Sequence, residues 1–401
     1  MCENKTRSKV LYIIIASVLF LNFSFWLTSE MNTMIRYFLI LGINGIVLLF
    51  RRRFVLSKNL LKSFLMIIGI QMVSAVFTGT YMGVTTGLYI STISAFLFVV
   101  AVDYDEFQEV FRYFVIVECI CSLVVFFAYL VAPSIFDVFS TITTWRQGRI
   151  FFKNVYISVL PVSMGSYYRN FGIFVEPGIH ATIISFAFIQ ELFHRKTNIK
   201  VVILYIMTVI TTISTSGVIS IVMIMIVYML STPQSETSSK LKNRILVAFI
   251  FGVIIFFFLY QSGYITTYIF DKLSVTDTIS GHERRKGYEI VLTEFLNHPV
   301  LGMGLKKAIG TYYVEQNATM TATILNWFGV YGSIYGLLCC GGLWRYEMRN
   351  IRTSMTLKFL MVAVLFVITF SQDFSREFII FVMVFYGYSG IKRESIEENY
   401  E

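Results

Sequence analysis

The sequence has few charged residues for its length. Asp, Glu, Lys and Arg make up only 14% of the 401 residues, whereas hydrophobic residues make up 56%. A soluble domain of this size does not need so much apolar surface, and long apolar runs with few charges are typical of transmembrane helices. The shortage of charge therefore argues against an ordinary soluble domain and favours an integral membrane protein.

Proline and cysteine are also scarce, at five residues each, so the apolar runs have few breaks. Four cysteines lie in apolar runs and the fifth is Cys2, which predicts packing rather than disulfides or metal binding. The sequence holds no nucleotide-binding glycine loop, HExxH, paired CxxC or nucleophile elbow. We therefore expect no metal and no cofactor.

The net charge of +9 does not indicate a nucleic-acid partner. In a membrane protein an excess of Lys and Arg mostly reflects topology and contact with anionic lipid. The basic N-terminus leads into a long apolar run without a small-residue cleavage site, so we interpret it as an uncleaved first helix.

The apolar runs predict one all-α polytopic membrane domain, residues 1–401, with about twelve transmembrane helices. The predicted helices span residues 10–27, 35–50, 60–77, 84–102, 113–132, 179–193, 201–213, 218–230, 245–260, 322–343, 359–370 and 378–391. A short acidic link, residues 103–109, precedes the fifth helix.

Two long polar segments, residues 133–178 and 261–321, interrupt this series. Placing the N-terminus in the cytoplasm puts most Lys and Arg residues in cytoplasmic loops, as the positive-inside rule requires. Both polar segments then lie on the outer face, where we expect them to contain short amphipathic helices and to form one site together.

The stretch from Ser280 to Gly304 is the centre of the second segment. Ser280 and Glu283 form a capping-box pattern, and an apolar stripe with helical spacing follows until Pro299. The first turn of this predicted helix carries three cations, although a helix N-terminus is already partly positive. A bound anion such as phosphate would reverse that penalty. The alternative is a solvated basic turn without a ligand.

Arg284 is the first candidate ligand for such an anion, because its guanidinium matches phosphate oxygens with two hydrogen bonds. His282 is a candidate for proton transfer or an ordinary polar surface residue, and His298 before Pro299 is expected to be a helix C-terminal cation. Further positive charge comes from Arg285, Lys286, Lys306 and Lys307.

The first segment also carries cations against the topology rule, at Arg146, Arg149 and Arg169. Arg169 is a candidate partner of Glu176 or an interfacial anchor. Glu176 directly precedes Pro177 at the start of a predicted helix, so its carboxylate is either a favourable cap or a catalytic or substrate-orienting group.

Four more titratable residues have open roles. Glu118 lies inside a predicted membrane helix, where an ionisable side chain is costly and by default has a functional or paired role. His180 follows Glu176 closely and remains ambiguous. Asp373 and Arg376, in the last outer turn, either join the site or pair with each other.

Three short motifs resemble signatures of the O-antigen polymerase and O-antigen ligase superfamily. The first is Arg169-x-x-Gly172-x-Phe174-x-Glu176-Pro177-Gly178. The second is Arg284-x-x-x-Tyr288 with His298-Pro299-Val300-Leu301-Gly302-x-Gly304, and the third is Gly329-x-x-Gly332. The motifs are short, so their order and the predicted topology carry the resemblance.

One departure from the family pattern concerns the ligase branch. That branch usually carries a His shortly before the glycine pair, whereas this sequence has Ala318 and Thr319 there, with Gln316 and Asn317 nearby. The resemblance therefore favours the Wzy-type polymerase branch and leaves the general base open.

The resemblance implies a glycosyltransferase that joins oligosaccharide repeat units carried on undecaprenyl diphosphate, at the outer face of the bacterial cytoplasmic (inner) membrane, for O-antigen or capsule. It also implies the lipid bilayer, a chain-length regulator and a flippase as partners. Arg284, Arg285 and Arg169 would neutralise the diphosphate and Glu176 would activate the attacking hydroxyl. Sugar rings would stack on Trp145, Tyr288 and Trp327, for which core packing is the alternative.

Two other functions compete with this one. Twelve helices are also typical of transporters, such as a flippase for lipid-linked oligosaccharide, but the loop lengths show no two-fold repeat. The third possibility is a non-catalytic scaffold for envelope assembly.

Overall fold

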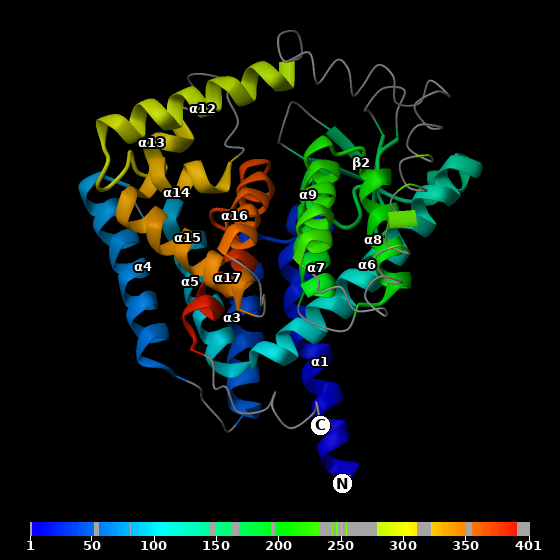
Figure 1. The fold of residues 1–401 in the computed structure, drawn as a ribbon, viewed down its shortest axis with the longest axis horizontal. Coiled ribbons are helices and arrows are strands. Elements are labelled where there is room, and N and C mark those ends of the chain that lie inside the picture. The colour runs from blue at the N-terminus through cyan, green and yellow to red at the C-terminus, as the bar shows by residue number, and fades with distance from the viewer. Residues whose placement is uncertain are drawn as a thin grey trace.

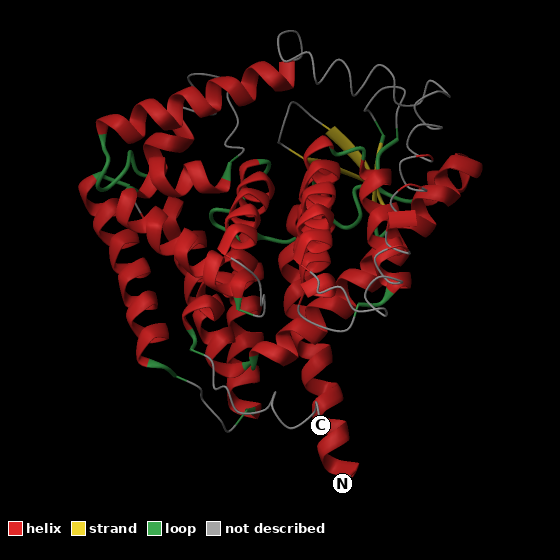
Figure 2. Cartoon of the chain, viewed as in Figure 1, coloured by secondary structure: helices red, strands yellow, loops and turns green. Residues whose placement is uncertain are grey.

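The computed structural model describes most of the chain as helix (Figures 1 and 2). The described residues are 2–51, 56–80, 82–144, 150–162, 168–193, 197–231, 243, 246–247, 250, 254, 279–310, 322–349 and 355–390. Their apolar sequences explain the helices. Inside a membrane the backbone N–H and C=O groups find no water to bond, so each helix satisfies them with its own internal hydrogen bonds.

The N-terminal half of the chain supplies the helices α1 (Cys2–Phe23), α2 (Phe25–Glu30), α3 (Thr33–Phe50), α4 (Lys58–Phe77), α5 (Met82–Ala101), α6 (Tyr104–Val131), α7 (Pro177–Phe193), α8 (Ile199–Thr212) and α9 (Thr215–Ser231). The C-terminal half supplies α12 (Ile279–Asn297), α13 (Leu305–Ile309), α14 (Thr323–Tyr331), α15 (Ser333–Met348), α16 (Met355–Phe370) and α17 (Phe378–Tyr388).

The centre of the bundle is α17. Every residue from Phe378 to Tyr386 is buried, and the helix packs against α15, α5 and α4. A helix that is apolar all round belongs in the interior of a large bundle. This central position fixes the turn between α16 and α17 close to the axis of the molecule.

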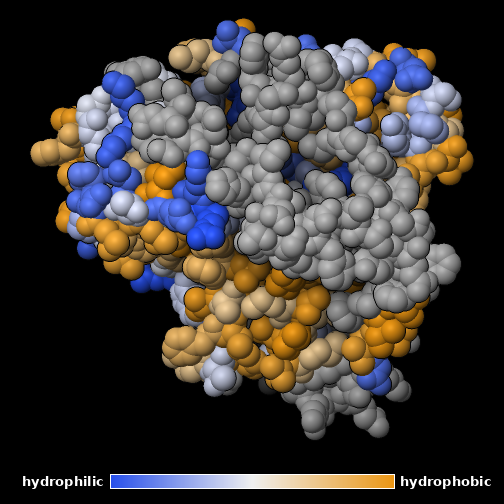
Figure 3. Space-filling model, turned by 90° about the horizontal axis from the view of Figure 1, so that it is seen from above, coloured by the Kyte–Doolittle hydropathy of each residue, from blue (hydrophilic) through white to orange (hydrophobic). Residues whose placement is uncertain are grey.

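The outer surfaces of the bundle suit lipid rather than water. Large apolar side chains are exposed on several helices, with Leu49 of α3 83%, Val76 of α4 78% and Val131 of α6 86% exposed. Figure 3 shows hydrophobic residues around the rim of the molecule. Among the described helices α4 and α6 are long and apolar enough to cross a membrane, and shorter apolar helices accompany them. These features indicate an all-α membrane protein.

The described parts of both polar segments lie at the same end of the bundle. Figure 1 places β2 and α12 at the end opposite the first turn of α1. In the first segment, the 3-10 helix η1 (Pro133–Val138) precedes a three-stranded antiparallel sheet in the order β1 (Thr141–Thr144), β2 (Ile150–Asn154) and β3 (Val159–Pro161). Thr141 pairs with Lys153, and Phe152 pairs with Pro161.

Three expectations from the sequence need correction. The acidic link is part of a membrane helix, because Asp103 and Glu106 form a capping box that starts α6 at Tyr104. The predicted helix 322–343 is broken between α14 and α15 at Gly332, whose φ of 87° no helix allows. The first polar segment contains the small sheet where we expected amphipathic helices.

The second polar segment contains the predicted helix. The predicted stop before Pro299 agrees with α12, which runs from Ile279 to Asn297 and so includes Ser280 inside the helix. Most of the predicted helix 245–260 lies outside the described residues.

Candidate functional site

The first signature forms the turn that leads into α7, and Arg169 anchors its start. The Arg169 side chain is buried, and its Nε and Nη2 donate to the carbonyl oxygens of Thr212 and Ile213 at 2.9 and 3.1 Å. The last carbonyls of a helix have no partner within the helix and attract cations. Arg169 therefore caps the C-terminal end of α8.

Asn170 ties the same turn to two membrane helices. Its Nδ2 donates to Thr211 Oγ1 of α8 at 3.0 Å and to Ser122 Oγ of α6 at 3.3 Å, while its Oδ1 accepts from the Gly172 amide at 3.1 Å. A buried amide with these partners fixes the turn in one arrangement.

Glu118, whose partner the sequence did not reveal, is paired with His180. Glu118 Oε2 accepts a hydrogen bond from His180 Nε2 at 2.6 Å, and the two residues are only 6% and 0% exposed. Gly172 closes over this pair with a φ of 57°, and a Cβ atom there would collide with Glu118 Oε1. The sequence identified Glu118 and His180 separately as residues with open roles, and no local pattern in it indicates that they pair.

Among the described residues, one cluster could hold a metal ion. Its donor atoms, from Glu118, Cys119 and His180, lie within 4.8 Å of one another. The direct hydrogen bond between Glu118 and His180 already occupies one donor of each. We therefore interpret the cluster as a paired carboxylate and imidazole.

Glu176 is the last residue of this turn before α7 begins. It directly precedes Pro177, the first residue of α7, and its side chain is half-buried. Its backbone oxygen accepts from the amides of Ile179 and His180 at 3.1 and 3.3 Å. Glu176 thus has a capping position, and its carboxylate remains close enough to solvent to meet a substrate.

The turn between α16 and α17 connects this position with α14. A Cβ atom at Gly178 would collide with Gln372 Nε2, so the two residues touch. The Gln372 carbonyl accepts from Thr323 Oγ1 at 2.6 Å, and the Ser375 carbonyl accepts from Trp327 Nε1 at 3.2 Å. Trp327 is fully buried, which agrees with the packing alternative for this side chain.

Asp373 and Arg376 pair with each other, which is one of the two alternatives that the sequence left open. Arg376 Nη2 lies 3.7 Å from Asp373 Oδ2, in the turn whose Gln372 touches Gly178. Asp373 Oδ1 also accepts from the Ser375 amide at 2.9 Å, so this carboxylate shapes the turn itself.

The second signature contacts the same turn through α12. The ring of Tyr288 lies 4.6 Å from the ring of Phe370, the last residue of α16. One turn further along α12, buried Val291 packs on Gly329 of α14. The contacts between Tyr288 and Phe370 and between Gln372 and Gly178 therefore bring the two signature segments to one place.

The predicted cations differ in how far the structure describes them. Arg284 lies in α12 one turn before Tyr288, and the side chains of Arg284 and His282 lie outside the described residues. Arg285 is exposed and pairs with Glu289 at 3.0 Å. Lys286 is half-buried and Lys306 is exposed. Outside the described residues lie Trp145, Arg146, Arg149, Gln316, Asn317, Ala318 and Thr319.

The glycines of the second signature have a structural role. The amides of Met303 and Gly304 donate to the carbonyls of Gly329 and Val330 at 2.9 and 3.0 Å. At Gly332 a Cβ atom would collide with the Val300 carbonyl oxygen. The turn after Pro299 is thereby fastened along the end of α14, which holds α12 in place over the site.

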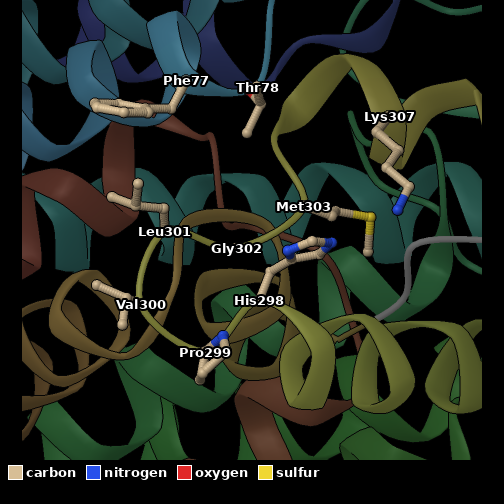
Figure 4. Close-up of a pocket in the computed structure, with 9 residues that line it drawn as sticks. All are labelled: Phe77, Thr78, His298, Pro299, Val300, Leu301, Gly302, Met303 and Lys307. Carbon is tan, nitrogen blue, oxygen red and sulfur yellow. The ribbon is translucent and has the colours of Figure 1, made fainter.

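A groove of about 450 Å³ lies on the far side of this turn (Figure 4). The end of α4 forms one wall, and the chain from His298 to Met303 forms the other, with Lys307 at the edge. At the edge of the groove, Glu294 Oε2 lies 2.7 Å from Lys307 Nζ and 3.8 Å from His298 Nε2. His298 directly follows α12, as expected for a cation at its C-terminal end.

The fold and the site define a membrane protein with a polar site at one end of its helices. A family model described as O-antigen ligase matches residues 201–326, which run from α8 into α14 and include the second signature. No curated protein matches the chain. The match supports the O-antigen polymerase and ligase superfamily, and with the apolar helices it indicates a membrane protein.

Proposed function

We propose that this protein is a polysaccharide polymerase that joins oligosaccharide repeat units carried on undecaprenyl diphosphate, for O-antigen or capsule. The observation that carries the proposal is the meeting of the two signature segments at the turn between α16 and α17. Tyr288 packs on Phe370 at the start of that turn, and Gln372 within the turn touches Gly178, two residues after Glu176.

The proposed reaction is one glycosyl transfer. A hydroxyl oxygen of the acceptor unit attacks the anomeric carbon of the donor sugar, and the bond from that carbon to the diphosphate oxygen breaks. Glu176 orients the hydroxyl and takes its proton. Arg284, with Arg285, Lys286 and Lys306, neutralises the charge that develops on the departing undecaprenyl diphosphate.

Four further roles belong to the same proposal. His282 is the candidate that exchanges a proton with the leaving group, because it lies in the same turn of α12 as Arg284. Arg146 and Arg149 add positive charge from the first segment, and Arg169 holds the turn that carries Glu176. Tyr288 is a stacking surface for a sugar ring as well as a contact of Phe370.

Polymerase is preferred over ligase because Ala318 and Thr319 stand where the ligase branch usually has a His. The acceptor is then a second lipid-linked repeat unit, and the product is the same chain lengthened by one unit. We place the site on the outer face of the inner membrane, where it works with a flippase that delivers the units and a chain-length regulator.

The test is deletion of the gene in its host, followed by gels of surface and lipid-linked glycans. A polymerase deletion leaves single repeat units on the outer face, and a ligase deletion leaves long lipid-linked chains that are not transferred. A flippase deletion traps units on the cytoplasmic face. Long surface ladders in the deletion strain, or trapped cytoplasmic units, would overturn the proposal.

Complementing alleles assign the residues. We expect Arg284→Ala and Glu176→Gln to leave single units at normal protein levels in the membrane. Lys62→Ala is the control, because Lys62 is an exposed cation near the start of α4 at the other end of the bundle. Full ladders from Arg284→Ala would show that Arg284 is not part of the site. Normal ladders from the charge-preserving Arg284→Lys would show that the two-pronged guanidinium group is not needed.

A further inference from the structure

We propose that the buried pair of Glu118 and His180 is a positioning device that sets the orientation of Glu176; this inference rests on the proposed function. The pair does not touch the substrate in this proposal. It acts through the first turn of α7, which carries Glu176 at its start and His180 four residues later.

The connection from the pair to Glu176 is short and continuous. The His180 amide donates to the Glu176 carbonyl oxygen at 3.3 Å, so the two residues share one helical turn. The His180 ring stacks on Phe174 with 5.3 Å between the ring centroids, and its Nε2 donates to Glu118. A rotation of the imidazole would therefore displace the chain on both sides of Glu176.

The surroundings of Glu118 allow little movement. Gly172 lies against its carboxylate, and Asn170, two residues earlier, is bonded to both α6 and α8. The backbone carbonyl of Asn170 lies 3.5 Å from His180 Nδ1. The imidazole is thus held on both ring nitrogens between α6 and the turn that carries the first signature.

Stability alone is a weak reason for such a pair. Taking a carboxylate and an imidazole out of water costs free energy that their attraction repays only partly, and well-packed apolar residues often serve as well. A hydrogen bond with fixed donors and acceptors instead specifies one geometry. Because His180 lies one helical turn after Glu176, that geometry can set the orientation of Glu176.

The chain contains a natural control for this idea. Arg112 and Glu191 also join α6 to α7, with Arg112 Nε donating to Glu191 Oε2 at 2.6 Å. Glu191 is fully buried, like His180. This second pair lies at the other end of α7, far along the helix from Glu176, so it shares the structural role of the first pair and lacks the proposed positioning role.

The kinetic experiment compares Glu118→Leu, His180→Leu and His180→Gln with Glu191→Leu in the purified full chain, reconstituted with lipid-linked repeat units. We expect Glu118→Leu and His180→Leu, which remove the hydrogen bond, to lower kcat by about 10²-fold, since misplacement of a catalytic group by about 1 Å has that effect. KM should stay within about twofold, because substrate binding is not changed. His180→Gln, which keeps a donor for Glu118, should recover part of kcat.

Glu191→Leu should keep kcat even where it lowers thermal stability. Equal losses of kcat in Glu118→Leu and Glu191→Leu, or losses explained by the amount of folded protein, would overturn the positioning role. A rise in KM without a fall in kcat would also overturn it.

A second measurement does not depend on polymerase activity. Glu176→Cys is labelled with a membrane-impermeant maleimide, alone and combined with Glu118→Leu or with Glu191→Leu, and the chain without Glu176→Cys gives the background. A labelling rate that changes only with Glu118→Leu supports the positioning role, and an unchanged rate overturns it. If the labelling rate shifts while the wild-type chain makes no polymer, the proposed function fails and the positioning of residue 176 stands.

Discussion

The ring of Tyr288 lies 4.6 Å from the ring of Phe370 and is tilted by 39° against it. Tyr288 belongs to the second signature and Phe370 ends α16, so this contact joins segments that are far apart in the sequence. It also places α12 directly above the turn whose residue Gln372 touches Gly178.

Tyr288→Ala should therefore lower both polymer formation and stability, whereas Tyr288→Phe should retain both. An aromatic pair contributes about 0.5–1.5 kcal/mol beyond the area it buries. Its loss also removes the contact between the middle of α12 and the end of α16. Ladder length and thermal unfolding in detergent measure the two effects. A Tyr288→Phe protein as defective as Tyr288→Ala would show that the hydroxyl, rather than the ring contact, is what matters.

Gly172→Ala should destabilise the protein strongly. The residue has a φ of 57°, and the added Cβ would meet the Glu118 carboxylate in the buried interior. Such a backbone conformation costs a non-glycine residue about 1–3 kcal/mol before the collision is counted.

Gly69→Ala is the matched control for this substitution, because no atom lies within 4 Å of the Cβ it would add and the residue lies inside α4. Thermal unfolding of both variants in the same detergent makes the comparison. Similar melting temperatures for the two would mean that the contact between Gly172 and Glu118 is not tight.

Much of the fold could be predicted because it depends on apolar runs. The end of α12 before Pro299 is confirmed, since proline acts locally, whereas Ser280 lies inside α12 and does not mark its first residue. The break at Gly332 could not be predicted, because it depends on a turn from another segment: the Val300 carbonyl occupies the place of a side chain there. Burial of that turn, rather than local propensity, decides where α14 ends.

The site was predicted in part. The sequence identified Glu118 and His180 as residues with open roles, but their pairing requires α6 and α7 to be neighbours, which no local pattern states. Arg169 was predicted as a partner of Glu176, as an interfacial anchor or, from the resemblance, as a ligand of the diphosphate. The structure shows its guanidinium on the last carbonyls of α8. The reason is that the end of α8 lies inside the protein, where its carbonyls need donors.

Arg169→Lys should consequently reduce the amount of folded protein more than the affinity for the lipid-linked unit. A lysine has no planar guanidinium that could donate to the carbonyl oxygens of Thr212 and Ile213 at the same time. Membrane protein levels and KM for the repeat unit separate the two effects. A large rise in KM at normal protein levels would instead make Arg169 a direct ligand of the diphosphate.

The contact between Gly178 and Gln372 can be tested by a double-mutant cycle. Gly178→Ala alone should reduce polymer formation, because the new Cβ would displace the buried Gln372 side chain and with it the turn that carries Asp373. Combining Gly178→Ala with Gln372→Ala removes the colliding amide, so the double variant should recover activity relative to Gly178→Ala.

Residues in direct contact show coupling energies of about 0.5–3 kcal/mol, whereas the effects of substitutions at distant residues are additive. Polymer yield and thermal unfolding of all four proteins give that coupling directly. Strict additivity would mean that the two signature segments do not meet through this turn, and the main structural support for the proposed polymerase site would be lost.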